Sequence, residues 1–203
     1  MKNIVFVCAV FCLLIYSHKV QAREINFGFY YASIEGEPQA NLDKITSDID
    51  SSLIALDQFV GIHAKNIFTK SLPFSPAVID RGLGLGVDGE VFFKNMRQNN
   101  LDYGNADFIF IIVPITISVR LTMFDGWVES IPGKAALICY KDTEPQDYLT
   151  SILAHEFGHL LGINHAENDS CGPSRLIMCQ VFEILTKDTA IGKSFEDALK
   201  ALP

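Results

Sequence analysis

Hydrophobic and polar residues alternate over 24–33, and a period of two predicts a β-strand there. Apolar residues recur with helical periodicity over 42–59, and 66–72 is compatible with a second strand. A helical pattern returns over 88–99, and a continuous apolar run over 107–113 is typical of a strand buried on both faces. Strands and helices therefore alternate, which predicts an α/β chain with a largely central sheet.

The second half of the chain continues this alternation. Residues 115–122 read as a further extended segment, and 133–140 as the last strand. The glycine-rich stretch 84–89 fits a dinucleotide-binding pattern, but no obvious strand and strong helix flank it, so we expect a loop. Ser194 is expected to cap a short C-terminal helix that ends near residue 202.

A helix with unusual chemistry is predicted over 144–162. Thr143, followed three residues later by Gln146, resembles a capping box at its start. Near its end the chain reads His-Glu-Phe-Gly-His-Leu-Leu-Gly-Ile-Asn-His, residues 155 to 165. At about 100° per residue, His155 and His159 lie one turn apart on one face of this helix, so both imidazoles can reach one metal ion.

The residues around these two histidines complete a catalytic pattern. Glu156 lies about 100° round the helix from His155. It is near enough to the metal face of the helix to hold a water molecule there without binding the metal itself. Gly162 stands where the chain must turn sharply, and that turn can bring His165 to the metal as a third ligand. Three neutral imidazoles leave the fourth position of a tetrahedral zinc ion open for water, as in catalytic rather than structural sites.

At these residues the chain resembles the metzincin family of zinc peptidases. Its long zinc motif is matched at His155, Glu156, His159, Gly162 and His165. The resemblance implies an α/β (α+β) zincin fold, in which a mixed twisted sheet carries the active-site helix. It also implies a small irregular C-terminal subdomain with a C-terminal helix and a methionine in a tight turn beneath the metal.

Met178 looks like that Met-turn residue. Residues 23–203 would then form one catalytic domain, with an upper part to about residue 162 and a lower part after it. Among metzincins the chain looks most like the reprolysin (adamalysin) branch, whose members share the sequence around the first two histidines. Ala166 and Cys179 depart from that branch, because reprolysins usually have Asp after the third histidine and a cysteine before the Ile-Met pair.

Residues 1–22 read as a signal peptide, with Lys2 before an apolar run of 13 residues that is short for a membrane span. We therefore expect a secreted, extracellular protein without a membrane anchor. The net charge of −8 at pH 7 becomes −10 when the two lysines of this segment are removed. An acidic balance argues against nucleic acid and anionic membranes as partners. One small domain without an evident dimer seam favours a monomer.

Three of the five cysteines lie outside the signal peptide, and an oxidising compartment favours one disulfide among them. A bridge between Cys171 and Cys179 would tie down the segment that carries Met178. A bridge from Cys139 to either of them is the alternative. Asn168 begins an Asn-Asp-Ser glycosylation sequon close to His165.

The most direct hypothesis is a zinc endopeptidase with one Zn²⁺ per chain. The metal would activate water and polarise the scissile carbonyl, while Glu156 accepts the water proton. The resemblance implies a protein or peptide substrate bound in extended conformation beside an edge strand, for which 115–122 is the candidate. The alternative hypothesis is a secreted binding protein or toxin that keeps zinc only for stability.

Overall fold

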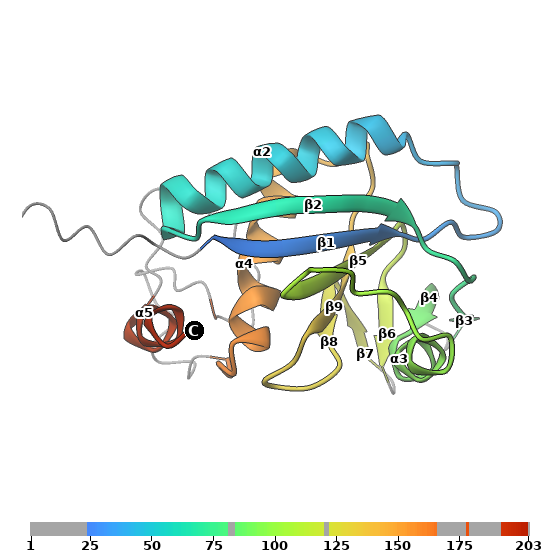
Figure 1. The fold of residues 1–203 in the computed structure, drawn as a ribbon. Helices are drawn as coiled ribbons and strands as arrows, with labels where there is room; N and C mark the ends of the chain where they lie inside the picture. The colour runs from blue at the N-terminus through green and yellow to red at the C-terminus, as the bar shows by residue number, and fades with distance from the viewer. Residues whose placement is uncertain (1–23, 81–83, 120–121, 166–177, 179–191, 203) are drawn as a thin grey trace, which may run out of the picture.

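The computed structural model describes residues 24–80, 84–119, 122–165, 178 and 192–202. Their centre is a five-stranded sheet of order β2-β1-β5-β9-β8 (Figure 1). Its strands are β1 (Ile25–Tyr31), β2 (Ala64–Ser71), β5 (Phe108–Val113), β9 (Ala135–Cys139) and β8 (Gly126–Val128). The first four run parallel, and β8 runs antiparallel to β9 at the end of the sheet.

A second, smaller sheet has the order β3-β4-β6-β7. Its strands are β3 (Val78–Asp80), β4 (Leu85–Asp88), β6 (Ile117–Val119) and β7 (Thr122–Phe124). The described helices are α2 (Leu42–Val60), α3 (Gly89–Gln98), α4 (Gln146–Leu160) and α5 (Gly192–Lys200). Among the described residues, none of these helices has the length and apolar character needed to cross a bilayer.

Two hydrophobic cores cover the two faces of the large sheet. On one face, α2 and α4 pack against β1, β5 and β9, and the ring of Phe27 lies 4.9 Å from that of Phe110 and 5.1 Å from that of Phe157. On the other face, α3 and the smaller sheet cover the alternate residues of β5 and β9. Because both faces are covered, every residue of β5 is buried, which explains its unbroken apolar sequence.

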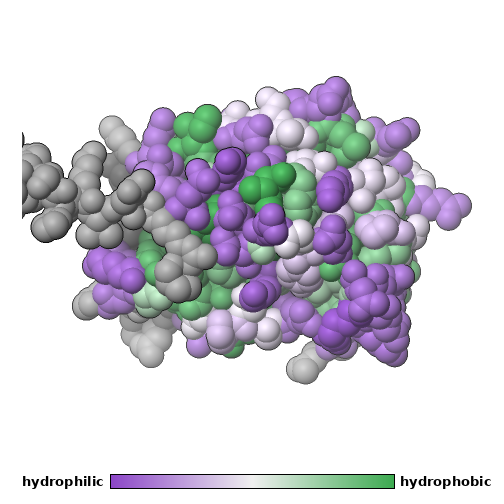
Figure 2. Space-filling view, in the orientation of Figure 1, coloured by the Kyte–Doolittle hydropathy of each residue, from purple (hydrophilic) through white to green (hydrophobic). Residues whose placement is uncertain are grey.

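Local sequence explains where two of the helices begin. The Asn41 side chain accepts a hydrogen bond from the Lys44 amide at 3.1 Å and caps α2, and Asp88 does the same for the Val91 amide of α3 at 3.0 Å. Helix α2 buries one side against the sheet and turns polar residues outward. Hydrophilic residues predominate on the face shown in Figure 2, with separate smaller hydrophobic areas.

The predicted strands and helices at 24–33, 42–59, 66–72, 88–99, 107–113 and 133–140 are confirmed to within two residues at each end. The predicted C-terminal helix is present as α5, but it begins at Gly192, so Ser194 lies inside the helix and the prediction that it caps the helix is wrong. Two further local predictions are wrong. The Thr143 capping box does not form, since α4 begins after Pro145, which makes no side-chain cap. The segment 84–89 is not a loop, because it contains β4 and the start of α3.

The most consequential correction concerns the extended segment 115–122. It contributes β6, which lies between β4 and β7 inside the smaller sheet and is not an edge strand of the large one. The edge next to α4 is β8, which was not predicted from the sequence. Only three residues form β8, too few to show a strand period.

Candidate metal centre

Helix α4 carries the first two histidines of the motif in a buried position. It packs against α2 and against the sheet, and every residue from Leu149 to Leu160 is buried. His155, Glu156 and His159 are 9, 4 and 6 % exposed. Leu153 and Phe157 anchor the opposite side of the helix in the core, as the apolar pattern predicts. The polar side chains of the motif are therefore held on a rigid element at the border of the core.

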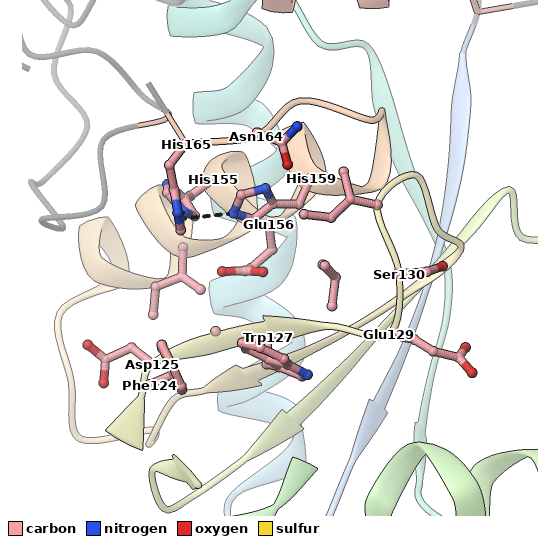
Figure 3. Close-up of a pocket in the computed structure, with 14 residues that line it drawn as sticks. Phe124, Asp125, Trp127, Glu129, Ser130, His155, Glu156, His159, Asn164 and His165 are labelled. Carbon is pink, nitrogen blue, oxygen red and sulfur yellow. Dashed lines mark hydrogen bonds between the residues drawn. The ribbon is translucent and has the colours of Figure 1, made fainter. Parts of the chain in front are cut away.

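Gly162 ends the helix in the way that the sequence predicts. Its φ is +95°, in the left-handed region that favours glycine. The Gly162 amide donates to the His159 carbonyl at 2.9 Å, and the Ile163 amide donates to the Gly158 carbonyl at 3.0 Å. This turn reverses the chain and places the imidazole of His165 beside the two helix histidines (Figure 3).

The three imidazoles converge on one point. The Nε2 atom of His165 lies 3.2 Å from Nε2 of His155 and 3.2 Å from Nε2 of His159. A tetrahedral zinc ion with Zn–N bonds of about 2.0–2.1 Å separates its nitrogen ligands by about 3.3–3.4 Å. One donor atom of each histidine lies within 4.8 Å of the others. The donor set and its spacing therefore fit zinc.

Two features favour the neutral, metal-binding form of these rings. The Nδ1 atom of His159 lies 2.7 Å from the Ile163 carbonyl, so a proton on Nδ1 can be donated there and the lone pair on Nε2 left for a metal. Desolvation by burial lowers the pKa of His159 and that of His165 below their ordinary value. His63 is the only other histidine among the described residues, and it pairs with Asp57 at 2.8 Å on the surface.

Glu156 is the least solvated of the four polar residues of the motif. Desolvation by burial raises the pKa of its carboxyl to about 8. Its Oε2 atom is buried and has no hydrogen-bond partner among the described residues. A positive charge held by the nearby imidazoles would favour the ionised form of this carboxyl, which is the form that accepts a proton as a general base.

The site opens into a cavity of about 480 Å³ between α4 and β8. Its lining residues come from the continuous segment 124–131, which contains β8, from α4, and from Asn164 and His165 after the helix. Figure 3 shows the histidines and Glu156 above β8, with Trp127 on the far side of that strand. The edge strand beside the candidate metal centre is therefore β8, which corrects the assignment of 115–122 to that place.

The remaining predicted site residues lie further from the cavity or beyond the described chain. Met178 is 4 % exposed and belongs to the core that contains α4, while its role in a Met-turn stays a prediction. Cys139 is a buried free thiol, and both of its candidate disulfide partners lie outside the described residues, so the disulfide stays a prediction. Cys171, Cys179 and Asn168 lie outside the described residues.

Comparison with known proteins bears on this arrangement. No family model matches the sequence, and no curated protein does. Among solved structures, archaemetzincin from Methanopyrus kandleri superposes with a TM-score of 0.61 over 87% of this chain and 94% of that chain. The fold is shared with the archaemetzincins. The sequence identity is 16%, so the likeness concerns the fold.

Two further solved structures, from other organisms, are also similar to this chain. A zinc-dependent peptidase from Methanocorpusculum labreanum gives a TM-score of 0.52 at 16% identity, over 85% of this chain and 99% of that chain. Metalloproteinase-II from Bacteroides fragilis gives 0.54 at 16% identity, over 90% of this chain and 54% of that chain. These likenesses support a zincin-like peptidase fold, and the reprolysin branch stays a prediction from the motif.

Proposed function

We propose that this chain is a zinc-dependent endopeptidase. The observation that carries the proposal is the meeting of three imidazole donors and one buried carboxylate, whose Oε2 has no hydrogen-bond partner among the described residues, in a single cavity beside an edge strand. A structural zinc site does not need a desolvated carboxylate beside its ligands, whereas peptide hydrolysis requires a general base at that place. The fold shared with zinc-dependent peptidases supports the same conclusion.

His155, His159 and His165 would hold the zinc ion. Zinc bound there would supply Lewis acidity, lowering the pKa of a coordinated water and polarising the carbonyl of the substrate. Glu156 would take the proton of the attacking water and deliver it to the leaving amine, because its carboxylate lines the same cavity as the three imidazoles. Its position in the cavity, shielded from bulk solvent, keeps that proton within the site.

The substrate would be a peptide in extended conformation. Strand β8 pairs with β9 along one edge, and its other edge is available, among the described strands, for main-chain pairing with a peptide. We further propose that residues 1–22 are a signal peptide, that the mature chain is secreted as a monomer, and that it binds one zinc ion.

The test uses the purified chain, a library of unstructured peptides and mass spectrometry, with and without a zinc chelator. We expect cuts that the chelator abolishes and that added zinc restores. Glu156→Gln should keep the zinc content of the parent and lose peptide cleavage by a factor of about a hundred or more. His63→Ala, on the surface, is the matched control and should cleave like the parent.

A folded parent chain that holds zinc and cuts no peptide would overturn the endopeptidase proposal and favour the binding-protein alternative. A Glu156→Gln variant as active as the parent would leave the metal site in place and refute the role of the carboxylate.

A further inference from the structure

The edge strand and the catalytic carboxylate approach each other unusually closely. A Cβ atom built on Gly126 would lie 2.5 Å from Cδ and 2.7 Å from Cγ of Glu156, and nearer still to its Oε1 atom. Non-bonded carbon atoms attract at about 3.5–4.0 Å, so a methyl group and the carboxylate cannot share this space. Figure 3 shows the Glu156 carboxylate in the gap between α4 and β8.

The backbone does not explain why residue 126 is glycine. Its φ lies outside the left-handed region, unlike that of Gly162, so any amino acid can adopt its conformation. Gly126 also pairs regularly with Ile138 in the ladder between β8 and β9. Space beside Glu156 is therefore the reason that a side chain is excluded at this position.

Because α4 is held by the core, an added methyl group would have to displace the side chain of Glu156 and not its helix. Glu156 is 4 % exposed, and its helix is fixed by the core residues Ile152 and Phe157. A methyl group at position 126 would push the end of the Glu156 side chain away from β8, either toward the imidazoles or out of the cavity. Because this side chain has rotatable bonds, the variant protein can still fold with the carboxylate displaced.

We propose that Gly126 is a positioning residue, whose missing side chain sets where the Glu156 carboxylate stands relative to the three imidazoles and the edge strand. The inference rests on the proposed function, since position matters only if Glu156 moves a proton. Side chains of a strand point perpendicular to the sheet, whereas an added peptide pairs with the strand in its plane. A methyl group at position 126 should therefore disturb Glu156 and leave peptide binding along β8 in place.

The first measurement is the kinetics of zinc-loaded Gly126→Ala. We expect kcat to fall about 100-fold, because a misplacement of about 1 Å can cost that much, with KM within about twofold of the parent value. Zinc content should match that of the parent. The matched control is Gly28→Ala, also a strand glycine, whose new Cβ would lie 2.7 Å from Cε1 of Phe68, nearer still to Cζ of the same ring, and 2.8 Å from Cδ1 of Ile109 in the other core. This control should lose thermal stability while its kcat per folded molecule stays unchanged.

A double-mutant cycle separates positioning from general damage. Glu156→Asp shortens the side chain by one methylene and should slow the parent strongly. In the Gly126→Ala protein the shorter side chain relieves the clash, so the same substitution should cost much less. If the double variant loses kcat by the product of the two single losses, the inference is overturned. A Gly126→Ala variant with parental kcat would overturn it as well.

A crystal structure of Gly126→Ala gives a readout that does not depend on activity. We expect β8 to stay in place and the Glu156 carboxylate to move by about 1 Å or more. An unmoved carboxylate would overturn the positioning role. A parent chain without peptidase activity would instead refute the proposed function, even if the carboxylate moves as expected.

Discussion

The protonation of Glu156 links the chemistry of the cavity to the stability of the zinc-free protein. Burial raises the pKa of this carboxyl to about 8, from an ordinary value of 4.5. The zinc-free folded protein therefore keeps the group neutral at a pH where the unfolded chain has already ionised it. A raised folded-state pKa means that the stability is complete below pH 4.5 and is lost as the pH rises through 8.

The loss can be worked out from these two pKa values. Between pH 6.5 and 8.5 it amounts to about 2 kcal/mol of unfolding free energy, since each unit of pKa difference corresponds to about 1.4 kcal/mol when fully expressed. Glu156→Gln cannot ionise, so this contribution disappears from the variant. The lowered pKa values of His159 and His165 act in the opposite direction, with stability lost as the pH falls, and they affect both proteins alike.

The assay is urea unfolding of chelator-treated protein at pH 6.5 and 8.5, followed by the fluorescence of Trp127, the one tryptophan in the chain. The midpoint of the parent should fall by about 1 M more than that of Glu156→Gln over this interval. Parallel pH dependence of the two proteins would refute the reasoning, because it would mean that Glu156 ionises in the folded state at an ordinary pH.

Three further predictions concern the surroundings of the site. Gly162→Ala forces a left-handed φ of +95° on a residue with a Cβ, so the free energy of unfolding measured in urea should fall by about 1–2 kcal/mol. The same change should weaken zinc retention by moving His165. A fully zinc-loaded variant of parental stability would contradict this prediction. Zinc retention during dialysis should be constant from pH 8 to 6.5 and fall below that, because burial lowers the pKa of His159 and of His165; release already near pH 8 would contradict neutral ligands. Tyr140→Phe removes a hydroxyl that donates a hydrogen bond to Asp48 at 2.9 Å in the core. The free energy of unfolding in urea should therefore fall by about 1–3 kcal/mol, with kcat unchanged. A variant as stable as the parent would show that this hydrogen bond contributes nothing.

The candidate metal ligands were predictable from the sequence because their geometry is local. His155 and His159 are one helical turn apart, and Gly162 stops the helix through its own backbone conformation, so the convergence of three imidazoles follows from short-range rules. The strands β1, β5 and β9 were predictable for a similar reason. Each carries a run of residues whose apolar pattern reflects burial against one or two covered faces.

The identity of the strand that faces α4 across the cavity could not be predicted from the sequence, because it depends on tertiary structure. Residues 115–122 have the extended character of an edge strand, yet the described part of this segment pairs within the smaller sheet, and the three residues of β8 form the edge of the large sheet. Pairing partners come from distant segments, and a strand this short carries no pattern that reveals them.

The burial and the raised pKa of Glu156 were also decided by tertiary structure. Sequence alone placed its carboxylate near the metal face of a helix, through angles that hold for any helix. Its loss of solvent, its raised pKa and its fit against Gly126 arise only when α4 packs against β8, thirty residues away along the chain. Desolvation depends on what surrounds a group in space, and a linear pattern does not contain that information.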